Sequence, residues 1–455
     1  MASLSEGIQQ ALPRLQAELG EFLRIPSISA RPEHRGDVRA AAQWVAGQLE
    51  TLGFETTVHD TPGHPVVLGR QLAAGIDAPT VLIYGHYDVQ PVEPLDEWNS
   101  PPFEPTVSNG RVYARGSADD KGQLFLHLKA VELLLEEYGS LPLNFIFLAE
   151  GEEEVGSPNL IPFVHQHADE LACDLAVISD SAMFAPGLPS LLFSLRGLAY
   201  FELEVQGPRG DLHSGSYGGG VANPANALAQ IVASLHDARG RVAIPGFYDR
   251  VVEWDPETRL AIQHLPFDGT EFLREVGSEA SQGEVGYTLL ERLWIRPTCD
   301  VNGMISGYTG EGAKTVLPAR AKAKISFRLV PDQDPVRVGE LFREHVRSVT
   351  PAGVRSKVTT LHGGRPWRAR RDGGHLDAGA RALEKAYGIA PVLTGEGGSI
   401  PIVSEFERIL GTRVLLMGFA HPGANMHAPN EWFPLESLEK GTLALAYLYQ
   451  EVASL

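Results

Sequence analysis

Four apolar runs in the chain each lead to side chains that bind divalent metal ions. The runs and their endings are Val81–Gly85 before His86, Asn144–Leu148 before Glu153 and Glu154, Leu175–Ser179 before Asp180, and Val414–Gly418 before His427. Imidazoles and carboxylates are the ligands that zinc and related ions use in proteins. Four such endings in one chain predict a metal site.

The elements that would position these residues are strands of an α/β sheet. Short continuous apolar runs between turn residues are typical of strands buried on both faces of a parallel sheet. Ligands of open α/β sheets bind beyond the carboxyl ends of the strands. We therefore expect the four endings to meet in a polar pocket along one sheet edge.

Each motif also has an ordinary structural interpretation. His86-Tyr87-Asp88 could be a ligand with a carboxylate that orients its ring, but a histidine after a strand is more often a surface or core residue. Asp119 and Asp120 could bind metal or cap the following helix. His421 competes with His427 as a ligand.

The triplet Glu152-Glu153-Glu154 would usually be a solvated acidic turn. Its expected place at the sheet edge favours another interpretation, in which one carboxylate binds metal and its neighbour acts as a general base on a water molecule.

Size and composition limit the classes of function. A length of 455 residues predicts two or three domains. The net charge of −19 argues against nucleic acid and anionic membranes as partners. Because charged residues interrupt the apolar ones over residues 1–23, we expect no signal peptide, and the apolar runs are too short to predict a membrane span. With only Cys173 and Cys299, a reducing cytoplasm is the expected location.

The pattern of apolar and polar residues along the chain predicts a discontinuous catalytic domain and a second domain inserted into it. Residues 1–196 and 367–455 alternate strands and helices, with helices expected over 3–24, 36–52, from about 124 to 137, 376–387 and 435–452. Residues 197–366 include strands with one solvated face, at 200–205 and 321–329, and helices at 226–236 and 336–346. The predicted fold class is α/β, with a mainly parallel sheet flanked by helices and a smaller inserted α+β domain.

Five motifs, in order along nearly the whole chain, resemble the two-zinc metallopeptidases that include carnosinases, cytosolic non-specific dipeptidase, glutamate-releasing carboxypeptidases, aminoacylases and succinyl-diaminopimelate desuccinylase. The motifs are His86-Tyr87-Asp88, Gly116-Ser117-Ala118-Asp119-Asp120-Lys121-Gly122, Glu153-Glu154-Val155-Gly156-Ser157, Ile178-Ser179-Asp180 and His427-Ala428-Pro429-Asn430-Glu431.

The resemblance implies a role for each of these residues. One metal ion would be held by His86, Asp119 and Asp180, and the other by Asp119, Glu154 and His427. Asp119 would bridge the two ions, and the Asp119–Asp120 peptide would be cis. Asp88 would orient His86, and Glu153 would be the general base that acts on a bridging water.

The same resemblance extends to the inserted block, as a lid and dimerisation domain. His213, in Asp211-Leu212-His213-Ser214-Gly215, would reach an active site, in dimeric members that of the partner subunit. Arg328 would bind the substrate carboxylate. Further substrate contacts would come from Gly398 and Ser399, and from Thr315 and His362.

We therefore expect a metal-dependent exopeptidase that cleaves dipeptides or short peptides, because 152–157 and 211–215 look closest to the dipeptidase branch. The alternative is hydrolysis of N-acyl, N-carbamoyl or N-succinyl amino acids by the same chemistry. Zinc is the expected ion, with manganese and cobalt as alternatives, and a homodimer is the expected assembly. Two other classes, a metal-free binding protein and a nucleotide-binding sheet protein, lack support, since no ligand is missing and no GxGxxG or Walker pattern occurs.

Overall fold

The computed structural model describes residues 4–455, so the first residue of the predicted helix 3–24 and the start of the predicted domain 1–196 lie outside the described residues. The chain divides into two compact units, which are Met1–Phe193, Ala369–Thr394 and Glu405–Leu455 for unit 1, and Ser194–Arg368 and Gly395–Ser404 for unit 2. The assignment of 197–366 as a lid and dimerisation domain stays a prediction.

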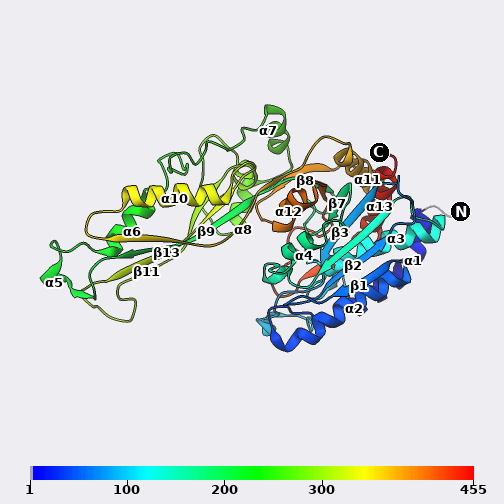
Figure 1. The fold of residues 1–455 in the computed structure, drawn as a ribbon, viewed down its shortest axis with the longest axis horizontal. Helices are drawn as coiled ribbons and strands as arrows, with labels where there is room; N and C mark the ends of the chain where they lie inside the picture. The colour runs from blue at the N-terminus through cyan, green and yellow to red at the C-terminus, as the bar shows by residue number, and fades with distance from the viewer. Residues whose placement is uncertain (1–3) are drawn as a thin grey trace. The chain divides into compact units, whose positions relative to one another are not determined.

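Unit 1 is built on a mixed sheet with the strand order β1-β2-β6-β3-β7-β17-β8 (Figure 1). These strands are β1 (Glu55–His59), β2 (Val66–Gln71), β3 (Thr80–His86), β6 (Asn144–Glu150), β7 (Leu175–Ile178), β8 (Ser190–Leu195) and β17 (Arg413–Leu416). The four central strands β6, β3, β7 and β17 are parallel, while β1, β2 and β8 run antiparallel to their neighbours. The fold is therefore α/β as predicted, with antiparallel strands added outside the parallel centre.

The four apolar runs form the four central strands. Because side chains alternate between the faces of a strand, a run that is apolar throughout must be covered on both sides. Val81 and Ile83 of β3 belong to the core that also takes in helices α1, α2, α3, α11 and α13, whereas Tyr84 packs against Phe406 of α12. The strands are thus fixed from both faces, and their ends hold the residues beyond them in place.

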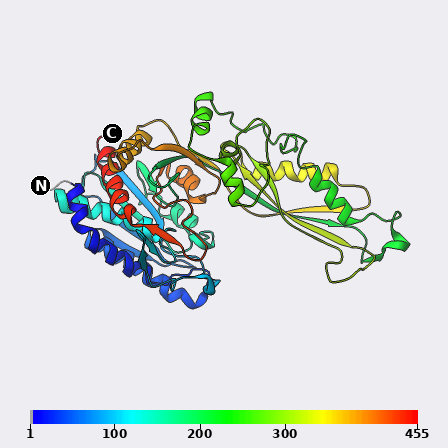
Figure 2. The same cartoon turned by 180° about the vertical axis from the view of Figure 1, so that it is seen from behind.

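The helices of unit 1 form layers over this sheet. They are α1 (Leu4–Leu23), α2 (Arg35–Thr51), α3 (Lys121–Tyr138), α4 (Leu160–Gln166), α11 (His375–Tyr387), α12 (Pro401–Leu410, which begins in unit 2) and α13 (Leu435–Val452). Figure 2 shows α13, in red, beside α1, in blue. A small separate sheet contains β4 (Thr106–Ser108), β5 (Arg111–Tyr113) and β18 (Trp432–Pro434).

Unit 2 has a four-stranded antiparallel sheet with the order β11-β13-β9-β14. Its strands are β9 (Gly197–Gln206), β11 (Thr298–Ser306), β13 (Arg320–Leu329) and β14 (Arg355–Gly364). Helices α6 (Pro224–Ala233) and α10 (Pro335–Val349) cover one face, and Phe201, Leu203 and Phe327 are buried beneath them. The other face of the sheet carries the alternate, partly exposed side chains.

The remaining elements of unit 2 are short. They are β10 (Leu212–His213), α5 (Ser214–Tyr217), α7 (Pro256–Gln263), α8 (Gly269–Glu275), α9 (Leu289–Trp294), β12 (Val316–Leu317) and β15 (Trp367–Arg368), with β16 (Val392–Glu396) at the boundary of the units. Strands β10 and β12 pair as a separate ribbon.

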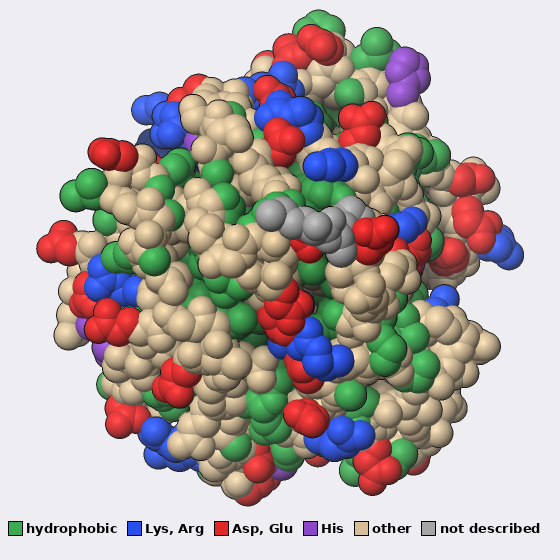
Figure 3. Space-filling model, turned by 90° about the vertical axis from the view of Figure 1, so that its right-hand side faces the viewer, with side chains coloured by type: hydrophobic (Ala, Val, Ile, Leu, Met, Phe, Trp, Pro, Cys, Tyr) green, Lys and Arg blue, Asp and Glu red, His purple; other side chains and the backbone are tan. Residues whose placement is uncertain are grey.

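Figure 3 shows one face of the molecule, on which Asp and Glu side chains are interspersed with Lys and Arg. Among the helices formed by residues 4–455, none has the length and apolar character needed to cross a membrane.

Candidate metal centre

The carboxyl ends of the central strands bring the predicted ligands together in unit 1. His86 is the last residue of β3, and Asp180 follows β7 after one intervening residue, Ser179. Asp119 lies just before α3, Glu154 lies in the short 3-10 helix Glu153–Val155 after β6, and His427 follows β17. Parallel neighbours end at the same edge, so side chains distant in sequence meet there.

Two clusters of potential ligands result, and they share Asp119. His86, Asp119 and Asp180 form one, and Asp119, Glu154 and His427 form the other; within each cluster the ligand atoms lie within 4.8 Å of one another. His86 Nε2 is 3.0 Å from Asp119 Oδ1, and His427 Nε2 is 2.9 Å from Asp119 Oδ2. The two oxygens of one carboxylate therefore face two different histidines, which is the arrangement that a bridging ligand needs.

Asp88 contacts both His86 and the turn that carries Glu153 and Glu154. His86 Nδ1 lies 3.1 Å from the carbonyl oxygen of Asp88 and 3.4 Å from its carboxylate. That carboxylate also accepts hydrogen bonds from the amides of Glu153 and Glu154, at 3.2 and 3.1 Å. One buried carboxylate thus fixes the ring that would present Nε2 to a metal ion and the turn that carries the second cluster's ligand.

The three glutamates in a row have separate environments. Glu152 is only 6% exposed, and its carboxylate accepts hydrogen bonds from the His64 amide at 3.0 Å and from Asn159 Nδ2 at 2.8 Å. Glu154 accepts one from Gln90 Nε2 at 2.7 Å and lies 3.3 Å from His427 Nε2. Glu152 therefore stabilises the turn, and Glu154 faces the second cluster.

The electrostatics of the site favour added positive charge. Burial raises the pKa of Glu153 to about 9, with the carboxylates of Asp180, Glu154 and Asp88 adding to the effect against the opposing influence of His86. Burial and the neighbouring Asp119 likewise raise the pKa of Asp180 to about 7. Buried carboxylates so close together repel each other when ionised, and divalent cations between them would remove that repulsion.

His427 and His86 also reduce the repulsion between the carboxylates, because each hydrogen-bonds to Asp119. Hydrogen bonds with Asp119 and Glu154 raise the pKa of His427 to about 10. Although burial opposes it, the hydrogen bonds from His427 and His86 hold the pKa of Asp119 well below its usual range. The oxygen and imidazole donors of the two clusters are a ligand set that fits two divalent ions.

The competing histidine lies elsewhere. His421 is buried, with its ring edge-on to Trp432 at 5.6 Å, and it belongs to neither of the two clusters. The Asp119–Asp120 peptide bond is cis, as the resemblance implied.

The sequence did not point to Glu431, which anchors the Asp119 loop. The carboxylate of Glu431 accepts hydrogen bonds from Arg115 Nη1 at 2.8 Å and from the amides of Gly116, Ala118 and Asp119 at 3.0, 2.8 and 3.1 Å. Gln123 adds a second tie, donating to the Ala118 carbonyl at 2.9 Å and accepting from the Phe419 amide at 2.7 Å. The only signal available was that Glu431 closes the motif that begins with His427.

The other predicted site residues lie in unit 2, where His213 is near Thr315, and Arg328 is near Ser399. His213 is exposed at the end of β10, where Nδ1 accepts a hydrogen bond from the Gly215 amide at 3.1 Å; its strand partner is Val316, next to Thr315. Arg328 on β13 donates to Ser399 Oγ at 3.2 Å, and the amide of Gly398 donates to Glu396 at 3.1 Å. Their substrate contacts stay predictions.

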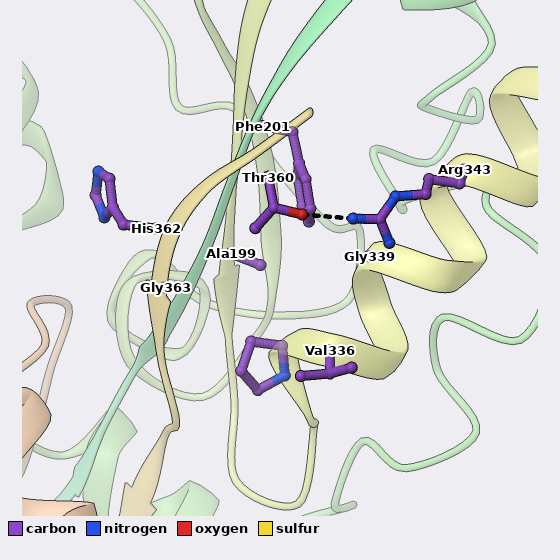
Figure 4. A pocket seen from close by; sticks show the side chains of 9 residues that line it. Ala199, Phe201, Val336, Gly339, Arg343, Thr360, His362 and Gly363 are labelled. Atoms are coloured by element: carbon purple, nitrogen blue, oxygen red, sulfur yellow. Dashed lines mark hydrogen bonds between the residues drawn. The ribbon is translucent and has the colours of Figure 1, made fainter. Parts of the chain in front are cut away.

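His362 lies at the rim of a pocket that differs from the metal centre. Figure 4 shows this pocket between α10 and strands β9 and β14, with Arg343 donating a hydrogen bond to Thr360 across it. The ring of His362 is directed away from that pair, and it makes an edge-on contact with Tyr200 at 5.1 Å. His362 therefore lies on the sheet face opposite α6 and α10, as does Arg328.

A sheet edge that carries two joined clusters of hard and borderline ligands, with the half-buried Glu153 in the same turn as one of them, defines a hydrolase of the divalent-metal type. The chain belongs to the peptidase family M20/M25/M40, whose model matches residues 82–451.

Relatives with known names cover nearly the whole chain. It is 34% identical to the Cys-Gly metallodipeptidase dug1 of Schizosaccharomyces pombe, over 99% of this chain and 98% of that protein. It is 30% identical to the Beta-Ala-His dipeptidase of Homo sapiens, over 98% of this chain and 87% of that one. Among solved structures, the M20 family metallo-carboxypeptidase Sso-CP2 of Sulfolobus solfataricus has a TM-score of 0.84 at 35% identity, covering 97% of this chain and 99% of that one. The chain is thus a metallopeptidase homologue along its full described length.

Proposed function

We propose that the protein hydrolyses dipeptides, using two divalent ions held by His86, Asp119, Glu154, Asp180 and His427. The observation that carries the proposal is the position of Asp119, whose two carboxylate oxygens face His86 and His427. Zinc is the proposed ion. When bound, two such ions polarise the scissile carbonyl and lower the pKa of a water molecule.

Glu153 is the proposed general base. The backbone amide of Glu153 donates a hydrogen bond to the Asp88 carboxylate at 3.2 Å. The charges of Asp180 and Glu154, one from each ligand cluster, act on the pKa of Glu153, which supports a position of its carboxylate beside both clusters. In this role the ionised carboxylate takes a proton from the attacking water and returns it to the leaving amine. The carboxylate must be ionised to start the reaction, and the same cations that its ligating neighbours attract would lower its pKa.

Residues of unit 2 complete the proposed mechanism. His213 would donate a hydrogen bond to the developing oxyanion, an effect commonly of about 10²–10³ in rate for one donor. The exposed position of its ring is compatible with action in its own subunit or in a partner subunit of a homodimer. Arg328 would hold the free carboxylate of the substrate, with Ser399 Oγ beside its guanidinium at 3.2 Å.

The dipeptide assignment is supported by the relatives, which include Cys-Gly and Beta-Ala-His dipeptidases. A second candidate is a carboxypeptidase that accepts longer peptides, which the Sulfolobus enzyme at 35% identity favours. Hydrolysis of N-acyl amino acids would use the same centre and is the remaining alternative. All three classes of substrate present a free terminal carboxylate.

The test is activity profiling of protein stripped with a chelator and reloaded separately with Zn²⁺, Mn²⁺ or Co²⁺. The substrates are dipeptides, tetrapeptides, and N-acetyl and N-succinyl amino acids. We expect no turnover without metal and the highest kcat/KM for dipeptides after reloading. Faster cleavage of tetrapeptides or acyl amino acids would replace the dipeptide assignment, and full activity of the stripped protein would contradict the metal mechanism.

A homodimer and a cytoplasmic location complete the proposal. The two cysteines, Cys173 and Cys299, are both free thiols, as expected in a reducing compartment. Sedimentation analysis of the full chain tests the dimer, and a monomer at working concentration would contradict it.

A further inference from the structure

Two arginines of unit 2 approach the same loop. Arg328 Nη1 donates to Ser399 Oγ at 3.2 Å, and Arg196 Nε donates to the Gly397 carbonyl at 3.1 Å. Ser399 Oγ also donates to the backbone carbonyl of Arg196 at 2.5 Å. The segment Gly397–Ser399 therefore ties the two arginines together.

The strand register places Arg328 on the face of the sheet opposite helices α6 and α10, which we call the open face. Arg328 lies directly opposite Leu198 of β9, and opposed residues of paired strands share a face. The neighbouring positions Ala199 and Phe201 point to the other face, under α6 and α10. Arg196 immediately precedes β9 and lies two residues before Leu198. Since residues two apart in an extended segment point to the same side, Arg196 is expected on the same face as Arg328.

Both guanidinium groups lack an acidic partner within residues 4–455. Neither forms an ion pair, although Arg196 is only 9% exposed. The nearby carboxylates have other donors: Glu396 accepts from the amides of Gly397 and Gly398 at 2.7 and 3.1 Å, and Asp300 accepts from Thr298 Oγ1 at 2.7 Å. A buried, unpaired cation is costly, and a second cation beside it adds repulsion.

The charge of Arg196 persists at neutral pH. Burial and the neighbouring Arg328 lower the pKa of Arg196 to about 10, so the group still carries its proton at pH 7. The pair is thus two positive charges, and an anion between them would remove their repulsion.

We propose that Arg196 is a second specificity-determining cation of the substrate site, which together with Arg328 binds the free terminal carboxylate of the substrate. The inference rests on the proposed function, since it assumes a substrate with such a carboxylate. Two guanidinium groups around one carboxylate give more donors than a single arginine, and they select against a neutral terminus. Arg196 also shapes the loop, because a side chain on Gly397 would come within 2.9 Å of Arg196 Nη2.

The experiment compares a substrate acid with its terminal amide in wild type, Arg196→Met, Arg196→Lys and Arg328→Met. The probe is the dipeptide that wild type cleaves fastest, together with the same dipeptide amide. We expect Arg196→Met to reduce the acid-to-amide ratio of kcat/KM by about tenfold, mainly through KM, since a charge-assisted hydrogen bond is lost. Arg328→Met is expected to reduce the same ratio, and Arg196→Lys should recover part of it.

Lys322→Met is the matched control. Lys322 lies on the same open face but already pairs with Glu202 and Glu204, at 3.2 and 3.1 Å. We expect the acid-to-amide ratio of kcat/KM in Lys322→Met to equal that of wild type.

Equal losses for acid and amide in Arg196→Met would show a purely structural role and overturn the inference, as would an unchanged ratio with normal activity. If Arg196→Met fails to fold by circular dichroism, Arg196→Lys decides: a reduced ratio supports the inference and a wild-type ratio overturns it. The ratio is equally measurable with an acyl amino acid and its amide. Failure of the dipeptide assignment would therefore appear in wild type, separately from failure of the Arg196 inference.

Discussion

The two carboxylate oxygens of Asp119 face His86 at 3.0 Å and His427 at 2.9 Å. Each histidine is held in turn, His86 through Asp88 and His427 through its contact with Glu154. At the residue scale, the metal centre therefore depends on a series of side-chain contacts, in which a carboxylate orients an imidazole and the imidazole faces a shared carboxylate.

Glu153 allows a direct test at this scale. Replacing it by Gln keeps the size of the side chain and removes its basicity, so we expect kcat to fall by about 10²–10⁴. Metal content should stay at the wild-type level, because the proposed ligands are unchanged. Steady-state kinetics with metal analysis of the same sample checks both, and near-normal turnover would show that Glu153 is not the base.

Glu431 is expected to act on the metal through Asp119. In Glu431→Gln the loop amides lose a carboxylate acceptor and Arg115 loses its ion-pair partner at 2.8 Å. We expect metal affinity to fall by about 10–100-fold, the range typical of residues that support ligands. Calorimetric titration with Zn²⁺ measures this change.

The matched control for this variant is Glu436→Gln, in which an exposed pair with Lys440 is removed. Wild-type affinity in Glu431→Gln, or an equal loss in both variants, would contradict the supporting role of Glu431.

Some residues of the site could be predicted from the sequence, and others could not. His86, Asp180 and Glu154 follow apolar runs, so their meeting at one edge could be predicted, and the structure brings them together. Glu431 could not be found this way. It acts through the amides of a loop more than 300 positions earlier, and such a contact leaves no local pattern.

At the element scale, the entrance to α3 carries the site. Gly122 lies in the first turn of this helix, and a Cβ there would come within 2.0 Å of the Ser117 carbonyl oxygen. Because that oxygen belongs to the backbone, the Asp119 loop itself would have to move.

We therefore expect Gly122→Ala to destabilise unit 1 by about 1–3 kcal/mol, as overpacking does, and to weaken metal binding. Gly47→Ala in α2 is the matched control, since nothing lies within 4 Å of its added Cβ. There the gain in helix propensity should stabilise by up to about 1 kcal/mol. Urea unfolding of both variants checks this contrast, and equal effects would mean that the close contact does not constrain the loop.

Strongly patterned elements could be predicted, and weakly patterned ones could not. The helix expected over 435–452 is α13, and the strand expected over 321–329 lies within β13. Strand β11 was not predicted, because the alternation of polar and apolar residues from Thr298 to Asn302 stops at Gly303, where the pairing register shifts. The short helices α7, α8 and α9 were also missed, since six to eight residues are too few to establish a helical period.

At the scale of the whole molecule, one buried histidine ties stability to pH. His127 of α3 is 1% exposed, with its ring nitrogens 2.7 Å from the Tyr449 hydroxyl and 2.8 Å from Ser179 Oγ. Burial lowers its pKa to about 3, far below the ordinary value of 6.5. Below pH 6.5 the histidine therefore takes up a proton in the unfolded chain, while in the folded protein it stays neutral. The free energy of unfolding consequently decreases as the pH falls below 6.5.

We expect the free energy of unfolding of the metal-free protein to fall by about 1 kcal/mol more in wild type than in His127→Gln between pH 7.5 and pH 5.5. The amide of Gln does not titrate, so the difference between the two proteins isolates His127 from other groups. Urea unfolding at both pH values, with chelator present, gives the comparison. Parallel losses in the two proteins would show that His127 is not responsible.

The fold class and family were also predictable at this scale, because five ordered motifs span the chain. The antiparallel strands β1, β2 and β8 of the main sheet were not, since pairing direction depends on tertiary contacts that periodicity does not encode. The placement of residues 395–404 in unit 2 was equally inaccessible, as it reflects contacts and not sequence order.

The paired metal centre is tested most directly by anomalous diffraction from crystals of the full chain grown with Zn²⁺. The account predicts two neighbouring zinc peaks, both within bonding distance of Asp119, one also bound by His86 and Asp180 and the other by Glu154 and His427. A single ion, or two ions that do not share Asp119, would contradict it.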